Sequence, residues 1–236
     1  MRAWGRSDLQ RDPETDRASH PFIYRLYRQF CQGIYGWAAP VYDIVADMVS
    51  GGQWDNWLAL MKDEIAEGRV LELGFGTGRL QAHLSERKEL EVHGLELSKD
   101  MHQRCSQRMK SKSLKSHRVR GNGTCLPYRH EYFDMVVATF PEEYIVQPDT
   151  LREINRILVS GGKVVIMGRW ISLRSKFLGS LFPVFYRAPR QEECEDLISK
   201  AKAVGMKARI ENKVLQNVIH HLVYFEKIDQ HGPEAI

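Results

Sequence analysis

The chain has 236 residues, of which 43% are hydrophobic and 27% are charged, so we expect one globular domain, with a small helical addition. Its formal net charge of +4 is too small to require a nucleic-acid partner. No apolar run approaches the length of a membrane span, and the N-terminus lacks the apolar core of a secretion signal, so we expect a cytoplasmic protein.

The four cysteines are widely scattered, at Cys31, Cys105, Cys125 and Cys194, and none belongs to a Cys-x-x-Cys pair. This spacing argues against both a zinc site and a disulfide framework. We therefore expect four reduced thiols and no metal.

The first 68 residues contain no strand pattern. Residues 1–20 are charged, mixed in sign and without apolar periodicity, so we expect a disordered tail. Aromatic and aliphatic residues recur at helical spacing over 22–37, and further helices are predicted at 41–50 and 53–67. We interpret 21–68 as an N-terminal helical cap, whose aromatic stripe either packs on the core or forms a hydrophobic lid over a substrate site.

A glycine-rich turn follows the cap. Apolar and acidic residues alternate over 70–73, Gly74, Gly76 and Gly78 come next, and a helical pattern follows, which predicts a strand, a tight turn and a helix N-terminus. Such a turn also occurs without any ligand. Glu72, however, suits a ligand that carries an ammonium or polarised amide groups, and the helix N-terminus favours a carboxylate nearby. Together these features suggest an amino-acid-like moiety.

Strands and helices then alternate as far as residue 167. A second strand at 91–97 ends on Glu96, where a doubly wound fold binds the two hydroxyls of a ribose. A helix is predicted at 99–109 and a third strand at 117–121. The nearly continuous apolar run 133–140 is typical of a buried central parallel strand. A helix at 151–158 and a fifth strand at 163–167 follow.

The C-terminal part begins with an amphipathic insertion at 171–190, which is unusually long for a connection between a strand and a helix. It either packs as an ordinary excursion or is an amphipathic cover, which receives a hydrophobic substrate or makes peripheral contact with a membrane surface. A helix at 192–204 and two closing strands at 207–215 and 220–228 complete the pattern. The predicted fold is α/β: a doubly wound, Rossmann-like, mostly parallel seven-stranded sheet with an antiparallel last strand and N-terminal helices.

Four ordered motifs between about residue 42 and residue 158 resemble the class I S-adenosylmethionine-dependent methyltransferases, of the small-molecule type that includes the ubiquinone and menaquinone C-methyltransferases (methyltransferase type 11-like). The motifs are Val70-Leu71-Glu72-Leu73-Gly74-Phe75-Gly76-Thr77-Gly78, Gly94-Leu95-Glu96-Leu97-Ser98, Gly121-Asn122-Gly123-Thr124-Cys125-Leu126-Pro127-Tyr128, and Phe133-Asp134 to Phe140 with the helix and turn after it. The resemblance implies that 69–230 is a methyltransferase domain and that its cofactor is S-adenosyl-L-methionine.

The resemblance also implies a role for each matched residue. The backbone of Gly74, Phe75, Gly76 and Gly78 would face the methionine part, with Glu72 toward the amino group and Tyr42 closing over that end. Glu96 would accept both ribose hydroxyls, because a carboxylate offers two acceptor oxygens. The other implied cofactor contacts are Leu97 and Met101 around the adenine, Asn122, Gly123 and Thr124 along its edge, and Thr139 and Phe140 at the end of the fourth strand. Many relatives have Asp in place of Asn122, so we expect weakened cofactor binding.

The candidate catalytic residues are Glu142 and Glu143, which follow the fourth strand. Methyl transfer from a sulfonium is an in-line displacement, so the protein mainly aligns the two reactants and a general base is optional. Either acid could deprotonate a hydroxyl or carbon acid or hold a cationic amine. Alternatively, both acids merely solvate an exposed turn. The segment lacks the Asn/Asp-Pro-Pro-Tyr/Phe signature of enzymes that methylate amino or amide nitrogens of nucleobases and glutamine.

Three functional hypotheses remain open. The first is a methyltransferase acting on a hydrophobic or amphipathic small molecule, such as a quinone precursor or a lipid. The second is an RNA or protein methyltransferase, suggested by a run of basic residues over 104–120, although such runs are usually solvated helix faces. The third is a cofactor-binding partner subunit without catalysis.

Overall fold

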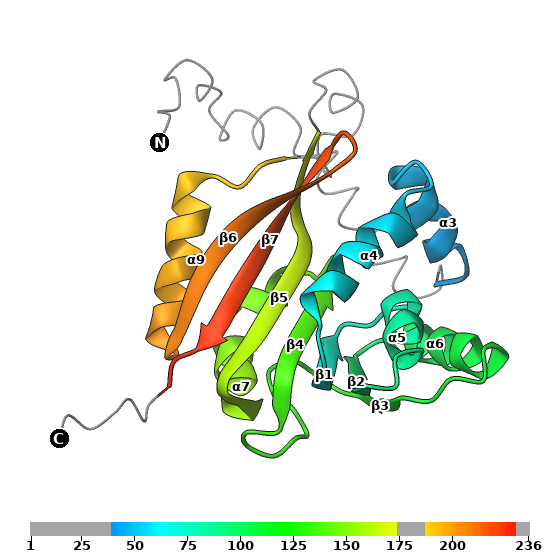
Figure 1. Ribbon diagram of the computed structural model, residues 1–236, viewed down its shortest axis with the longest axis horizontal. Helices are drawn as coiled ribbons and strands as arrows, with labels where there is room; N and C mark the ends of the chain where they lie inside the picture. Colours follow the sequence, from blue (N-terminus) through cyan, green and yellow to red (C-terminus); the bar gives the residue numbers. More distant parts are fainter. Residues whose placement is uncertain (1–38, 174–186, 230–236) are drawn as a thin grey trace.

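A single mixed sheet forms the centre of the computed structural model, which describes residues 39–173 and 187–229 (Figure 1). Its seven strands within these residues are β1 (Gly68–Leu73), β2 (Leu90–Glu96), β3 (His117–Arg120), β4 (Phe133–Thr139), β5 (Leu158–Leu173), β6 (Met206–Leu215) and β7 (Val218–Lys227). Their spatial order is β3-β2-β1-β4-β5-β7-β6. β1 to β5 pair in parallel, and β7 is antiparallel to both of its neighbours. The predicted α/β fold class is therefore confirmed.

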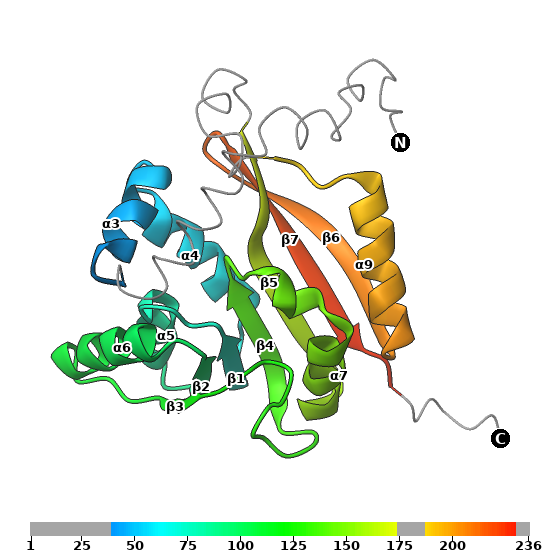
Figure 2. The same ribbon diagram turned by 180° about the vertical axis from the view of Figure 1, so that it is seen from behind.

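Helices cover both faces of the sheet, as the two opposite views in Figures 1 and 2 show. The helices are α3 (Ala39–Val49), α4 (Trp54–Glu64), α5 (Arg79–Ser85), α6 (Lys99–Ser111), the short 3₁₀ helix η1 (Glu143–Val146), α7 (Pro148–Ile157) and α9 (Gln191–Ala203). On one face η1, α7 and α9 bury apolar residues such as Leu151 and Leu197 against the sheet. On the other face α4 and α5 do so with residues such as Trp57 and Leu84.

β4 shows why a central strand has consecutive apolar residues, here over 135–138. Val136 and Ala138 pack into the cluster beneath η1, α7 and α9, whereas Met135 and Val137 pack into the cluster beneath α4 and α5. Successive side chains of a strand point to opposite faces, so a strand covered by helices on both faces must be apolar at both. The prediction of a buried central strand at 133–140 is confirmed.

β5 is longer than the predicted strand at 163–167. α7 ends at Ile157, and Leu158 already pairs with Phe133. At its other end β5 continues to Leu173, because β7 offers antiparallel partners as far as Val218. The continuation exists only through pairing with a distant strand, so local sequence periodicity gives no sign of it.

Some predictions concern residues outside the described ranges. These are the tail at 1–20, the aromatic stripe at 22–37 and most of the insertion at 171–190, of which the structure describes 171–173 as the end of β5 and 187–190 before α9. α3 and α4 correspond to the two predicted helices of the cap. Among the described residues, no helix combines the length and apolar character needed to cross a membrane.

Candidate functional site

The glycine turn connects β1 to α5 at the carboxyl end of the sheet. Gly74, Gly76 and Gly78 all have positive φ, and Gly78 caps α5 in the left-handed conformation at φ +79°. A Cβ on Gly78 would lie 2.3 Å from Sγ of Cys105 on α6. Glycine is therefore needed at position 78 for its backbone conformation and for the close approach of α6.

Glu72 is a buried carboxyl beside this turn. Its side chain is 1% exposed, and among the described residues its Oε2 has no hydrogen-bond partner. Burial raises the pKa of Glu72 to about 8; the neighbouring Gln81 side chain opposes this shift and the negative charge of Glu96 adds to it. A buried acceptor without a donor is costly for a folded protein, so Glu72 is suited to receive a cationic or N–H group of a ligand.

Glu96 lies next to the turn because β1 and β2 pair in parallel, with Leu73 opposite Leu95. Its Oε2 accepts a hydrogen bond from Gly76 N at 2.9 Å, and its Oε1 accepts one from Ser98 N at 2.8 Å. Each carboxylate oxygen has a second lone pair, so both can still accept from a ligand. The backbone thus fixes the carboxylate between the glycine turn and the start of α6.

The predicted adenine contacts lie after β2 and β3. Leu97 is 62% exposed, whereas Met101 is completely buried, so a planar group could enter between them only if Met101 were uncovered. The Asn122 Oδ1 accepts from Thr124 N at 3.1 Å, and both residues are exposed. The adenine position therefore stays a prediction.

Tyr144 was not identified from the sequence, although it lies in this site. Its hydroxyl is 2.9 Å from the place of a Cβ on Gly74, and its ring lies 3.0 Å from the place of a Cβ on Gly123. Burial, followed by the charge of Glu96, raises the pKa of Tyr144, so the phenol stays neutral. Its only sequence signal was its position in the segment after the fourth strand.

Thr139 is the last residue of β4, and Phe140 follows it directly. Phe140 has φ +51°, which is uncommon for an aromatic residue, and its N donates to Met167 O at 2.7 Å. Its ring stacks on Trp54 with 4.1 Å between centroids and occupies the space that a Cβ on Gly168 would need. Packing on both sides therefore holds Phe140 in this conformation.

The two candidate catalytic acids follow Phe140 and Pro141. Glu142 and Glu143 are exposed at the start of η1, at the carboxyl end of β4. Glu143 Oε1 lies 4.0 Å from Nη2 of Arg169, whose side chain is mostly buried. Their location matches the expectation, and their catalytic role stays a prediction.

Ion pairs attach α3 and α4 to the glycine turn. Asp43 accepts hydrogen bonds from Thr77 Oγ1 at 2.7 Å and from Arg108 of α6 at 2.6 Å. Arg79, the first residue of α5, contacts Asp47 of α3 and Asp55 of α4 at 2.7 and 2.9 Å. Tyr42 is half-buried against the core beneath α4 and α5. The sequence indicated Tyr42 as a cofactor contact, but it gave no sign of these pairs.

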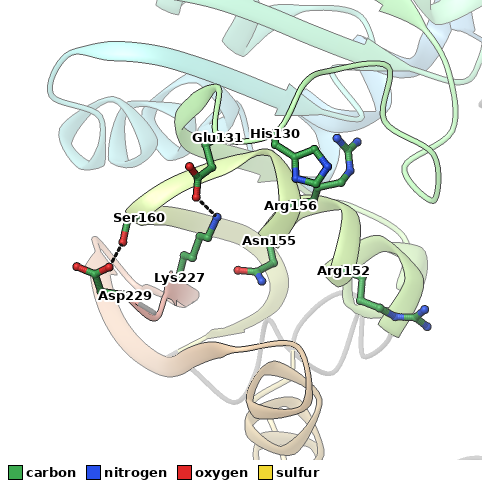
Figure 3. A pocket seen from close by; sticks show the side chains of 8 residues that line it. All are labelled: His130, Glu131, Arg152, Asn155, Arg156, Ser160, Lys227 and Asp229. Atoms are coloured by element: carbon green, nitrogen blue, oxygen red, sulfur yellow. Dashed lines mark hydrogen bonds and ion pairs between the residues drawn. The ribbon is translucent and has the colours of Figure 1, made fainter. Parts of the chain in front are cut away.

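A separate cavity of about 330 Å³ lies at the amino ends of the parallel strands, away from the glycine turn (Figure 3). It is lined by His130, Glu131, Arg152, Asn155, Arg156, Ser160, Lys227 and Asp229. Its three cations are paired: Arg152 with Asp149, Arg156 with Glu153, and Lys227 with Glu131. The carboxylates already satisfy these charges, so the cavity is a weaker candidate than the glycine turn.

Comparison with known proteins points to the part of the chain that contains the glycine turn. A family model described as a methyltransferase domain matches residues 70–162, which include the glycine turn, Glu96 and the end of β4.

Two relatives are named for quinone biosynthesis. The ubiquinone/menaquinone biosynthesis C-methyltransferase UbiE of Dinoroseobacter shibae is 29% identical over 165 residues, which are 65% of this chain and 66% of that protein. The demethylmenaquinone methyltransferase of Renibacterium salmoninarum is 30% identical over 132 residues, which are 54% of each chain. The chain thus spans just under two thirds of the first relative and about half of the second.

A solved structure shares the fold. Phosphoethanolamine N-methyltransferase 2 of Haemonchus contortus, in complex with phosphomonomethylethanolamine and S-adenosylhomocysteine, has a TM-score of 0.54 and 20% sequence identity. The similarity covers 75% of this chain and 53% of that chain.

Proposed function

We propose that this chain, of which residues 70–162 match a methyltransferase domain, is a class I S-adenosylmethionine-dependent enzyme that methylates a hydrophobic or amphipathic small molecule of the quinone-precursor or lipid type. S-adenosyl-L-methionine supplies an electrophilic methyl group on a sulfonium, which is transferred by in-line displacement. The observation that carries the proposal is the arrangement of Glu72 and Glu96 on neighbouring strands around one glycine turn.

The residues of the turn fit this cofactor in charge and in space. Glu72 presents a buried oxygen that has no hydrogen-bond partner within 39–173 and 187–229, which suits the amino group of a methionine part. Glu96 is fixed by two backbone N–H groups and keeps free lone pairs for two hydroxyls. Because Gly74 has no side chain, there is space beside the turn, and the Tyr144 hydroxyl lies at the edge of that space. We therefore assign Glu72 to the amino end and Glu96 to the ribose.

A hydrophobic acceptor is supported by apolar groups near the site. Phe140, at the carboxyl end of β4 where the methyl group would be presented, stacks on the buried rings of Trp54 and Trp57. α3, which is joined to the turn through Asp43, exposes three apolar residues at helical spacing: Val41, Ile44 and Met48 are 44%, 60% and 72% exposed. The relatives named for quinone methylation are consistent with this acceptor class.

Glu142 and Glu143 are the candidate bases in this proposal. Both acids are exposed and lie one or two residues beyond the Phe140–Pro141 segment, so they can approach an acceptor placed at the carboxyl end of β4. An acceptor carbon or hydroxyl that loses a proton during transfer would need such a group. We expect Glu142→Gln and Glu143→Gln to lower kcat while the affinity for the cofactor is unchanged.

An RNA acceptor has less support, because several cations of the basic run have local partners. Arg108 pairs with Asp43, Lys112 pairs with Glu86, and Arg120 Nε donates to Leu97 O. Their charge is therefore partly neutralised within the protein, which leaves fewer cations for phosphate contacts.

The proposal is tested by incubating the protein with isotopically methyl-labelled S-adenosylmethionine and separate lipid, RNA and protein fractions of a cell extract. We expect the label in lipid-soluble small molecules, detected by mass spectrometry. Glu96→Gln should abolish labelling, because its amide NH2 would face one of the two backbone N–H groups that now donate to the carboxylate. The surface control Glu86→Gln should retain labelling. Label confined to RNA or protein would overturn the acceptor class, and cofactor binding without any labelled product would support the partner-subunit hypothesis.

A further inference from the structure

Two histidines and a glutamate come together where β2 pairs with β3, at the other end of β2 from Glu96. The two strands are parallel, and His93 lies opposite His117 in the register. Glu91 comes two residues before His93, so both side chains lie on the same face of β2. One ligand atom from each of the three residues lies within 4.8 Å of the other two.

Aromatic rings hold His93 in place. The side chain is buried, and the rings of Tyr128, Tyr132 and Phe133 meet it edge-on at centroid distances of 5.9, 5.6 and 5.1 Å. The His117 ring stacks on the His93 ring at 4.7 Å with 25° between their planes. One imidazole is therefore rigidly oriented, and the second lies beside it with access to solvent.

Surrounding donors orient the carboxylate. Glu91 Oε1 lies 2.9 Å from both the Tyr132 hydroxyl and His93 Nε2, and Glu91 Oε2 lies 3.2 Å from Arg69 Nε. Hydrogen bonds of this kind to a ligating carboxylate are the usual outer shell of metal sites. Arg69 contacts Oε2, whereas His93 contacts Oε1, so the guanidinium and His93 lie at different oxygens of the carboxylate.

Two imidazoles and one carboxylate form a ligand set that suits zinc and similar divalent ions. Donor atoms around a tetrahedral zinc ion are about 3.3 Å apart, so small rotations of the exposed Glu91 and His117 side chains would bring the three atoms together. We propose that Glu91, His93 and His117 bind a divalent transition-metal ion of the zinc class, with one coordination position left for water or an external ligand.

The bound ion fastens an edge strand. β3 has only four residues and, among the described strands, pairs with β2 alone. The ion replaces the hydrogen bond between His93 and Glu91 with a link that also includes His117. It therefore ties β3 to β2 without contacting the glycine turn, and it does not depend on the proposed methyltransferase function.

Titration of the full chain with zinc chloride, followed by calorimetry, tests the site. We expect one ion bound per chain by the wild type and at least about tenfold weaker binding by His117→Gln and Glu91→Gln. Both replaced residues are exposed, so folding should be retained. His130→Gln changes an exposed histidine outside the cluster and should bind like the wild type.

Two further measurements make the result decisive. Cobalt(II) should give the visible absorption bands of a four-coordinate ion with the wild type and not with His117→Gln. Zinc at about 100 times its Kd should raise the unfolding temperature by about 5 to 10 °C in the wild type and not in His117→Gln. The proposal is overturned if the wild type binds no stoichiometric ion, or if His117→Gln and His130→Gln bind zinc equally well.

Discussion

Glu72 illustrates how a single residue can serve ligand binding at the expense of stability. Its carboxyl is completely buried, one of its oxygens lacks a partner among the described residues, and its pKa is raised to about 8. Folding must therefore either keep this group protonated or bury an incompletely satisfied charge. An opposite charge supplied by a ligand would remove that cost, which explains why such a residue occurs beside a binding turn.

The first prediction concerns the pH dependence of stability. The pKa of Glu72 rises from 4.5 to about 8 on folding, so the native state binds more protons and its stability falls as pH rises between these values. In this range Glu72 should lower the free energy of unfolding by about 1.4 kcal/mol for each unit by which the pH rises. Glu72→Gln mimics the protonated form and should lack this slope in urea unfolding from pH 5.5 to 8. The exposed Glu86→Gln should keep it; equal slopes in wild type and Glu72→Gln would refute the assignment.

The second prediction concerns cofactor affinity. A ligand ammonium favours the ionised form of Glu72, so binding should release a proton below pH 8. The Kd for S-adenosylmethionine should fall by up to about tenfold per pH unit from pH 6 to 8. Calorimetry in buffers of different ionisation enthalpy would measure the proton release. Glu72→Gln should bind weakly and without this pH dependence, and proton uptake by the wild type would contradict the role of Glu72.

The third prediction separates the two reasons for glycine at position 78. Gly78 and Gly161 both have positive φ. A Cβ at Gly78 would lie 2.3 Å from Cys105, whereas a Cβ at Gly161 would meet no atom within 4 Å in the part of the chain that the structure describes. Gly161→Ala should cost about 1 kcal/mol of unfolding free energy, and Gly78→Ala about 2 to 4 kcal/mol. Denaturant unfolding measures both values, and equal costs would show that Cys105 exerts no constraint.

At the scale of elements, α3 is held to the glycine turn by polar contacts as well as apolar packing. Asp43 bonds both Thr77 in the turn and Arg108 on α6, and the side chains of Asp43 and Arg108 are 27% and 25% exposed. Partial burial makes such a pair more strongly coupled than one on the open surface. The position of α3 over the site thus depends on Asp43.

The fourth prediction tests this link by double-mutant cycles. Asp43→Asn and Arg108→Gln should show a coupling of about 1 to 3 kcal/mol in unfolding free energy, because each change removes the ion pair and leaves the other charged group, among the described residues, with only its contacts to Thr77 to offset its partial burial. The matched pair is Glu86 with Lys112, whose side chains are 49% and 45% exposed, and its cycle should give at most about 1 kcal/mol. Cofactor affinity should fall in the Asp43 and Arg108 variants alone. Equal couplings in the two cycles would mean that solvent screens both pairs alike.

At the scale of the whole molecule, the two proposed sites lie at opposite ends of β2. Glu96 ends the strand at the glycine turn, and Glu91 lies near its start. Ligands that bind only the folded chain raise its stability independently when their sites are not coupled. We therefore expect each ligand to raise the stability of the folded chain by its own amount.

The fifth prediction follows from this separation. S-adenosylhomocysteine at about 100 times its Kd should raise the unfolding temperature by about 5 to 10 °C, and zinc should add its own shift to it. Glu96→Gln should remove the first shift and His117→Gln the second, as measured by scanning calorimetry. A combined shift clearly different from the sum would show that the two ends of β2 are coupled.

The sequence by itself determined the alternation of strands and helices, the central buried strand and the glycine turn with its two acids, because each depends on local periodicity and on residues close together in the chain. It did not predict the length of β5, the place of Tyr144 over Gly74, the contacts of Asp43 with Thr77 and Arg108, or the cluster of Glu91, His93 and His117. These features bring together residues that are far apart in sequence. Only strand pairing and helix packing decide which of them meet, and no local pattern encodes that choice.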